Sequence, residues 1–295
     1  MQVFYELTEN KNLALALGYF DGVHLGHQKV IKSAVDYAQN NGKKSAVITF
    51  KDHPCCYFYG VCPKYILSRK QREEEIAKLG VDFLYELDFN ETLAGLSAEE
   101  YLKNILIKYF SPAAISTGFN HHFGARKSGD AEFLRQHQDR FKYFEIPPQK
   151  INNEIISSTA IRNYLNKGEI AKANEMLGKN FSISGKVIEG QKLGRKLGFR
   201  TANLIYPAEI VDIPFGVYEV QTTYGKGITN FGIRPTVSST KKAVLETHIL
   251  DFDKDIYGKT IKVEFLRMLR KEQKFNSLDE LKRQITIDIN RIQSI

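Results

Sequence analysis

The stretch LALGYFDGVHLGHQKVI, from Leu15 to Ile31, joins an apolar run to an amphipathic run through a turn with glycines and two histidines. The apolar run at 13–17 predicts a buried strand. Five apolar residues after the turn share one stripe of a predicted helix that ends near 41–42. They are Val30, Ile31, Ala34, Val35 and Ala38. SAVITF at 45–50 predicts the next strand, so the segment is a βαβ unit with parallel strands and a right-handed crossover.

The same alternation of short apolar runs and amphipathic segments continues to about residue 178. A charged helix is expected from Ser68 to Gly80, and Ser97 with Glu100 forms a capping-box pattern that opens another helix. Further strands are expected at 81–87, 113–117 and 142–146. The sequence therefore predicts a Rossmann-like, doubly wound α/β domain over residues 1–179.

The pattern changes after residue 180, where apolar and polar residues alternate between turns rich in Gly, Pro and Asp. Strands are expected at 181–187, 216–225, 243–252 and 259–269. A final helix begins at Ser277, with Glu280 completing a capping-box pattern. Its apolar face is expected to hold Leu278, Leu281, Ile285, Ile289 and Ile292. Residues 180–295 are therefore predicted to form a small antiparallel β-barrel with a C-terminal helix.

Charge and composition narrow the class of partner. The 295 residues carry a net charge of +8, which suits nucleic acid, an anionic membrane or phosphorylated small molecules. The basic residues are scattered, with no block typical of a nucleic-acid arm. No apolar run reaches the ~18–20 residues of a membrane span, and the N-terminus lacks a signal-peptide pattern. We expect a cytoplasmic monomer or weak homo-oligomer whose partners are small molecules, with no nucleic acid and no membrane among them.

All three cysteines, Cys55, Cys56 and Cys62, lie in one short segment beside His53. An odd number of cysteines in a cytoplasmic chain argues against a disulfide framework. A zinc site from His53 and these thiols is a minor alternative, because the spacing lacks a paired CxxC element. We therefore expect buried or loop cysteines here.

The turn between the first strand and helix is a candidate phosphate site. Gly18 follows the strand, His24 lies in the turn, and Gly26 and His27 open the helix. Backbone N–H groups and the helix dipole favour an anion at such a place. Histidines three residues apart point toward one phosphoryl group from the same side, which suits transfer at phosphorus. An HxxH spacing alone leaves a metal or structural role open.

Two later segments could also hold phosphate. ISSTAIR ends at Arg162 and places Ser158 and Thr159 at a helix start, where hydroxyls, N–H groups and a guanidinium could bind phosphate oxygens. An ordinary N-cap is the alternative for this segment. The glycine-spaced loop at 185–204 could wrap a phosphate chain, although a plain β-hairpin loop would look similar. Within it, Thr201 and Asn203 offer neutral oxygens suited to hydrated Mg²⁺.

The first half resembles the nucleotidyltransferase superfamily of HxGH enzymes, through Gly-x-Phe-Asp-Gly-x-His-x-Gly-His at 18–27 and the ISSTxxR element. The resemblance implies that His24, His27 and Arg162 stabilise the transition state. It also implies an ATP site formed by Gly18, Phe20, Gly26, Ser158 and Thr159. ITFKDHP at 48–54 and STGFNHHFG at 116–124 are similar to the flavin-adenylating branch. Asn120 and Phe123 are thereby implied as flavin contacts.

The second half resembles riboflavin kinases, through GKVIEGQKLGRKLGFRTANL at 185–204, which is similar to their GxVxxGxxxGRxLGFPTAN signature. LETHILDF and LRKEQKF follow in the order of that family. The resemblance implies ATP contacts at Gly190, Gly194, Arg195 and Gly198. It implies Mg²⁺ at Thr201 and Asn203, a general base at Glu246, and flavin contacts at Arg270 and Phe275. Arg200 departs from the pattern, because that family has proline there.

Taken together, the chain resembles the bacterial family that joins riboflavin kinase to FMN adenylyltransferase. The resemblance implies two reactions, with ATP, riboflavin and FMN as substrates and Mg²⁺ as cofactor. Three other functions stay open on the sequence. They are an enzyme with one degenerate half, a flavin- or nucleotide-binding regulator without turnover, and a nucleic-acid-binding protein. A regulator would not require a general base, and a nucleic-acid-binding protein would show a steep salt dependence of binding.

Overall fold

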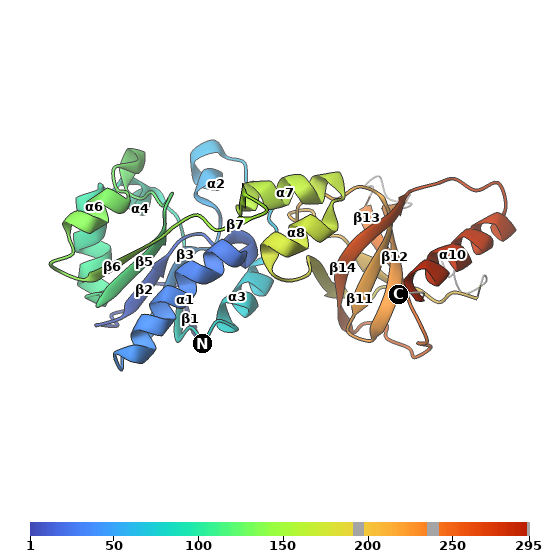
Figure 1. The fold of residues 1–295 in the computed structure, drawn as a ribbon, viewed down its shortest axis with the longest axis horizontal. Helices are drawn as coiled ribbons and strands as arrows, with labels where there is room; N and C mark the ends of the chain where they lie inside the picture. The colour runs from blue at the N-terminus through green and yellow to red at the C-terminus, as the bar shows by residue number, and fades with distance from the viewer. Residues whose placement is uncertain (191–197, 235–241, 294–295) are drawn as a thin grey trace. The chain divides into compact units, whose positions relative to one another are not determined.

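The computed structural model describes residues 1–190, 198–234 and 242–293. The chain forms two compact units, Met1–Ser158 and Thr159–Ile295 (Figure 1). The expected boundary at 179/180 lies later than this division. The difference is the pair of helices α7 (Ser158–Lys167) and α8 (Ile170–Leu177), which fall almost entirely in the second unit.

The first unit is built on a six-stranded parallel sheet with the order β1-β4-β3-β2-β5-β6. The strands are β1 (Gln2–Phe4), β2 (Ala14–Leu17), β3 (Ser45–Phe50), β4 (Phe83–Leu87), β5 (Ala114–Gly118) and β6 (Lys142–Ile146). From β2 the chain proceeds outward through β3 and β4, and it then returns to the other side of β2 for β5 and β6. The sheet order therefore reverses beside β2, and ligands of doubly wound sheets bind at such reversals.

Helices cover both faces of this sheet (Figure 1). They are α1 (Leu25–Asn40), α2 (Pro54–Tyr59), α3 (Arg69–Ala77), α4 (Glu91–Gly95), α5 (Ala98–Tyr101), the π-helical η2 (Leu102–Phe110) and α6 (Ala131–Gln136). The α1 stripe is confirmed, since all five of its expected residues are buried. Leu102, Leu106 and Phe110 of η2 pack into a core with alternate residues of the central strands. The predicted doubly wound α/β domain is therefore confirmed.

The second unit is a nearly closed antiparallel barrel with the strand order β10-β13-β12-β11-β14-β9. The strands are β9 (Ser182–Lys186), β10 (Ala202–Ile205), β11 (Gly216–Thr222), β12 (Gly225–Arg234), β13 (Lys242–Ile249) and β14 (Thr260–Lys271). A bridge between Ile188 and Asn203 joins the two ends of the sheet. Helix α8 is fixed to this barrel, because the Asn174 amide donates to the Phe265 carbonyl at 2.8 Å.

The C-terminal helix α10 (Leu278–Gln293) packs only part of its apolar stripe. Ile292 is buried and Ile285 and Ile289 pack beside it against Val217 and Ile228. Leu278 is 54% exposed and takes no part in this packing. It lies at the first position of the helix, before the helix reaches the barrel core.

The cysteine segment corrects another expectation, because Cys56 and Cys62 form a disulfide. Helix α2 ends at Gly60, whose φ of 66° turns the chain back and brings the two Cα atoms to 4.4 Å. His53 caps this helix, with its Nδ1 accepting from the Cys55 N–H at 3.1 Å. In the described part of the chain, no group of three or more His, Cys, Asp or Glu side chains could hold a metal ion.

Among the described residues, no helix is both long enough and apolar enough to cross a membrane.

Three short elements complete the first unit. A two-stranded hairpin, β7 (Lys150–Ile151) with β8 (Glu154–Ile155), precedes α7. Short 3₁₀ turns occur at η1 (Asp21–Val23) and η3 (Ala125–Lys127). Of these, η1 lies in the turn after β2, where the candidate phosphate site is expected.

Candidate functional site

The turn between β2 and α1 has an uncommon backbone. Phe20, Gly22 and Val23 all have positive φ, at 60°, 82° and 42°. Glycine adopts such values without cost, but a β-branched residue such as Val23 is strained there. Strain of this kind persists only when the surroundings fix the backbone, and it concentrates at functional sites.

Hydrogen bonds from three directions fix this turn. The carboxylate of Asp21 accepts from the Ile66 N–H at 3.0 and 3.2 Å. The Asp21 carbonyl accepts from the Ser158 hydroxyl at 2.9 Å, which ties Ser158, the last residue of the first unit, to the turn. The Gln28 amide donates to the Val23 carbonyl at 3.0 Å. The turn is therefore held in one conformation by residues far apart in sequence.

The two histidines of the turn lie together at the start of α1. His24 is buried and caps the helix, with its Nδ1 accepting from the His27 N–H at 3.2 Å. A neutral His24 therefore carries its proton on Nε2 and presents a donor there. The two imidazoles stack with centroids 3.5 Å apart, and the Phe20 ring meets His27 edge-on at 5.3 Å. Two imidazoles and the N-terminus of a 16-residue helix are thus available to an anion.

Two glycines make room for these side chains. A Cβ at Gly18 would lie 2.8 Å from two ring carbons of Phe20. A Cβ at Gly26 would lie 3.1 Å from Cε1 of His24. Substitution at either position would displace an aromatic ring of the candidate site, so both glycines are explained by close approach.

Arg72 and Glu86 form a buried ion pair next to the turn. No pattern in the sequence indicated this pair. Arg72 of α3 and Glu86 of β4 are both buried, with 2.5 Å between Nη2 and Oε1. Arg72 also donates to the carbonyls of Tyr19 at 3.3 Å and Phe50 at 2.6 Å. It therefore joins the ends of β2 and β3. Burial raises the pKa of the Tyr19 phenol, which lies under the guanidinium at 4.4 Å.

Other predicted residues of the first reaction are less closely tied to this turn. Thr159 and Arg162 belong to the second compact unit, so their placement beside the histidines stays a prediction. Asn120 is exposed, and Phe123 packs its ring against Tyr101 at 5.5 Å within the core. That packing gives Phe123 a structural function, and its contact with flavin also stays a prediction.

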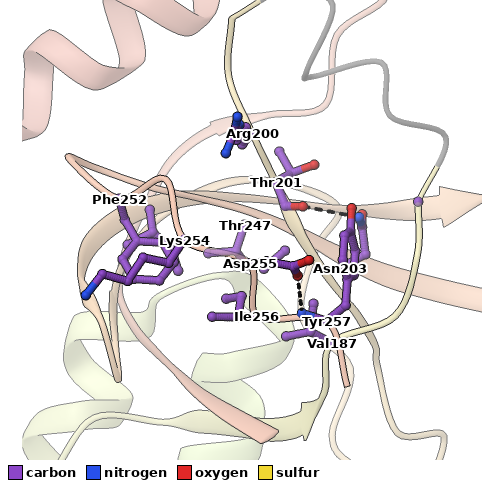
Figure 2. Close-up of a pocket in the computed structure, with 13 residues that line it drawn as sticks. Val187, Arg200, Thr201, Asn203, Thr247, Phe252, Lys254, Asp255, Ile256 and Tyr257 are labelled. Carbon is purple, nitrogen blue, oxygen red and sulfur yellow. Dashed lines mark hydrogen bonds between the residues drawn. The ribbon is translucent and has the colours of Figure 1, made fainter. Parts of the chain in front are cut away.

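The barrel holds a cavity of about 230 Å³ between the turn at 200–203 and the segment at 252–257. Figure 2 shows Thr201 and Asn203 on one side of it and Phe252 and Lys254 on the other. Gly190 lines it too, whereas Gly194 and Arg195 lie outside the described residues. Gly198 is described, and its φ of 92° suits only glycine.

The donor atoms in this cavity fit a hard cation. Thr201, Asn203 and Asp255 all line it, and their side chains carry a hydroxyl, an amide oxygen and a carboxylate whose Oδ1 accepts from the Tyr257 N–H at 3.0 Å. Mg²⁺ binds oxygen ligands and keeps several waters or phosphate oxygens in its shell. A few protein oxygens beside a cavity that could hold phosphates are therefore a suitable set.

A second cavity of about 290 Å³ opens between the barrel and α10. The predicted base Glu246 and the predicted flavin contacts Arg270 and Phe275 all line it. Leu281 and Ile285 contribute apolar surface from α10. Apolar surface beside convergent polar and charged groups is typical of sites for small organic ligands. The incompletely packed stripe of α10 therefore faces a cavity.

The two cavities meet at Thr201, which lines both. The strand register explains how a base comes to this junction. Glu246 of β13 pairs with Asn203 of β10 on one side and with Asn230 of β12 on the other. Directly opposed residues of neighbouring strands lie close together. Asn203 belongs to the first cavity, and Glu246 and Asn230 belong to the second.

Arg200, which departs from the family pattern, is tethered at two points. Its guanidinium donates to the Asp253 carbonyl at 2.6 Å. Its own carbonyl accepts from Nδ1 of His248 at 2.8 Å, and the His248 ring meets Phe199 edge-on at 5.4 Å. These contacts hold the turn that carries Thr201.

Both halves of the chain match known proteins. Family models described as FAD synthetase and riboflavin kinase match residues 6–160 and 177–295. The bifunctional riboflavin kinase/FMN adenylyltransferase of Buchnera aphidicola subsp. Schizaphis graminum is 36% identical, covering 96% of this chain and 94% of its own length. The protein of the same name from Listeria monocytogenes is 34% identical, with 94% and 90% covered. A crystal structure described as a macrolide-efflux protein from Streptococcus pneumoniae is 30% identical, with 98% of each chain covered and a TM-score of 0.89.

Proposed function

The chain belongs to the family of bifunctional riboflavin kinases and FMN adenylyltransferases, and on that premise we propose which of its residues carry the two reactions. One reaction phosphorylates riboflavin with ATP and gives FMN. The other transfers the adenylyl group of a second ATP to FMN and gives FAD and pyrophosphate. The observation that carries the assignment of residues is the junction of two cavities at Thr201.

In the kinase reaction, ATP occupies the first cavity and riboflavin the second. Glu246 takes the proton of the ribityl 5′-hydroxyl as that oxygen bonds to the γ-phosphorus, and the bond to the departing ADP oxygen breaks. General base catalysis typically contributes about 10²–10⁴-fold to a rate. The register that sets Glu246 beside Asn203 supports this assignment, because it brings the base to the edge of the nucleotide cavity.

Mg²⁺ is proposed as the cofactor of this site. Thr201 and Asn203 would hold it, and Asp255 offers a carboxylate in the same cavity. When bound, the ion neutralises charge on the phosphate oxygens. The residues that line the cavity orient the phosphate chain of ATP toward Thr201. The tethered turn at Arg200 keeps the Thr201 hydroxyl in place.

In the adenylyl transfer, a phosphate oxygen of FMN bonds to the α-phosphorus of ATP, and the bond to pyrophosphate breaks. An FMN phosphate is already an anionic nucleophile, so no general base is required. His24 donates from Nε2 and, with His27 and the N-terminus of α1, stabilises charge on the transferred group. Arg162 and the ISST hydroxyls are proposed to bind phosphate oxygens.

We also propose that the protein is cytoplasmic and is a monomer or a weak homo-oligomer.

Separation of riboflavin, FMN and FAD by chromatography tests these assignments. The purified chain is incubated with ATP, Mg²⁺ and either riboflavin or FMN. We expect both FMN from riboflavin and FAD from FMN. His27→Ala should lose FAD formation and keep FMN formation, and Glu246→Gln should lower FMN formation about 10²–10⁴-fold and keep FAD formation. Loss of both activities in a folded His27→Ala protein would contradict the assignment of two separate sites.

A further inference from the structure

Helix α10 places one buried carboxylate in the wall of the second cavity. Asp288 is 0% exposed, although it is a charged residue on a terminal helix. Its two oxygens have separate partners, with Arg270 Nε donating at 2.8 Å and the Gln284 amide at 3.0 Å. A buried carboxylate is costly unless it is paired and hydrogen-bonded, and Asp288 meets both conditions.

The partner of this carboxylate is a predicted flavin contact. Arg270 lies on β14, its side chain is mostly buried, and its Nη1 donates to the Lys271 carbonyl at 3.3 Å. Its guanidinium lies 5.7 Å from the centroid of the Phe275 ring. With Nε and Nη1 both engaged by the protein, the plane of the guanidinium is fixed. Arg270 and Phe275 then form one surface in the cavity wall.

We propose that Asp288 is a positioning residue of the flavin site, acting through Arg270. It fixes the guanidinium so that Arg270 and the Phe275 ring receive the flat ring system of riboflavin, and Gln284 orients the carboxylate from one turn earlier. The proposal rests on the proposed function of the second cavity. It extends that function to α10, which the Asp288–Arg270 ion pair joins to strand β14 of the barrel.

The site of action predicts a separation of kinetic effects. The reacting hydroxyl lies at Glu246 and Thr201, whereas Asp288 acts on the surface that receives the ring system. Asp288→Asn keeps the shape of the side chain and removes its charge. We expect the Kd and KM for riboflavin to rise about tenfold, with kcat and the KM for ATP changed less than about twofold.

Riboflavin fluorescence titrations and initial rates of FMN formation measure these constants. Asp279→Asn is the matched control, because Asp279 is an exposed carboxylate on the same helix. FAD formation from FMN should be unchanged in every variant. Arg270→Gln and the double variant Asp288→Asn with Arg270→Gln should bind riboflavin equally weakly, because the carboxylate acts only through the guanidinium.

Should Asp288→Asn fail to fold, Asp288→Leu with Arg270→Met replaces the whole pair by apolar groups, which buried pairs often tolerate. That variant should fold and bind riboflavin as weakly as Arg270→Gln. Unchanged riboflavin binding in Asp288→Asn, additive losses in the double variant, or equal losses for ATP and riboflavin would each overturn the proposal. A failure of the proposed function looks different, since Glu246→Gln would then form FMN at the wild-type rate.

Discussion

His121 shows how one half-buried side chain with a buried ring nitrogen makes stability depend on pH. In the described part of the chain, its Nε2 is buried without a hydrogen-bond partner, and the ring stacks on Phe123 with centroids 5.8 Å apart. Burial, with a smaller contribution from the neighbouring His122, lowers the pKa of this imidazole to about 4. The folded protein therefore keeps His121 neutral under conditions in which the unfolded chain binds a proton.

The sign and the pH range of this effect follow from the two pKa values. At pH values above about 6.5, the pKa of histidine in the unfolded chain, His121 is mostly neutral in both states and does not lower the free energy of unfolding. Between pH 6.5 and 4 the unfolded state binds more protons, so stability falls as the pH falls. At pH 5 this effect lowers the free energy of unfolding by about 2 kcal/mol. Urea titrations at pH 7 and pH 5 would measure the difference. His121→Phe should remove most of this loss.

His122→Gln is the control for that measurement, because His122 is exposed one position along the chain. It should leave the loss between pH 7 and pH 5 nearly unchanged. An equal pH dependence in the His121→Phe protein and in the wild type would show that the buried imidazole is not its source.

Residue identity alone indicated some parts of the site and concealed others. His24 and Gly26 could be placed in the candidate site from sequence, because histidines and glycines between a strand and a helix are typical of a turn that approaches phosphate. Arg72 and Asp288 could not, since each occurs in a charged helical segment typical of a solvated face. Their burial depends on partners on other elements, Glu86 and Arg270, and pairs of this kind leave no local pattern.

At the scale of elements, the turn at 198–201 has Arg200, which makes two hydrogen bonds, where the family pattern has a rigid proline. Proline in the family pattern would restrict the unfolded backbone, which is worth about 0.4–1 kcal/mol. Arg200 instead bonds to Asp253 and accepts from His248. An exposed hydrogen bond contributes a similar amount, so the two solutions should hold Thr201 about equally well. The difference that remains is a positive charge beside the first cavity, where ATP is proposed to bind.

Arg200→Pro should therefore form FMN at nearly the wild-type kcat, with weaker binding of the anionic ATP and no loss of Mg²⁺ affinity. We expect the KM for ATP to rise about three- to fivefold, which corresponds to roughly 1 kcal/mol. Rates of FMN formation across ATP and Mg²⁺ concentrations measure both affinities. Arg200→Lys keeps the charge and serves as the control. Unchanged affinities in Arg200→Pro would rule out this explanation of the arginine.

Periodicity predicted the elements better than it predicted what they contact. SAVITF was expected as a strand and forms β3 with the same bounds, because a short β-branched run between turns has few alternatives. The stripe of α10 was expected on one face of the helix, and that face packs Ile289 and Ile292 in the core while Leu281 and Ile285 also line a cavity. An apolar stripe indicates burial against something apolar, and a flavin ring system meets that requirement as well as a core does.

At the scale of the whole molecule, the two units have separate cores, and the histidine turn and the two barrel cavities lie in different units. The pattern of apolar and polar residues changes from an α/β type to a β type near residues 179/180, whereas the compact units divide after Ser158. The helices between these points are amphipathic, and an amphipathic pattern does not specify which core a helix joins. That choice depends on tertiary contacts such as those of Asn174, which bonds to the Phe265 carbonyl at 2.8 Å and the Phe181 N–H at 2.8 Å.

Separate sites imply that FMN made by one chain can be used by another. His27→Ala keeps the kinase site, and Glu246→Gln keeps the adenylyl-transfer site. A mixture of the two variants, supplied with riboflavin, ATP and Mg²⁺, should therefore produce FAD after a lag in which free FMN accumulates. The lag should shorten as the His27→Ala protein is increased, and chromatography of timed samples measures it. Each variant alone is the control and should produce almost no FAD from riboflavin. Absence of FAD in the mixture would mean that FMN must pass between the sites of a single chain, because diffusion through solvent would otherwise deliver it.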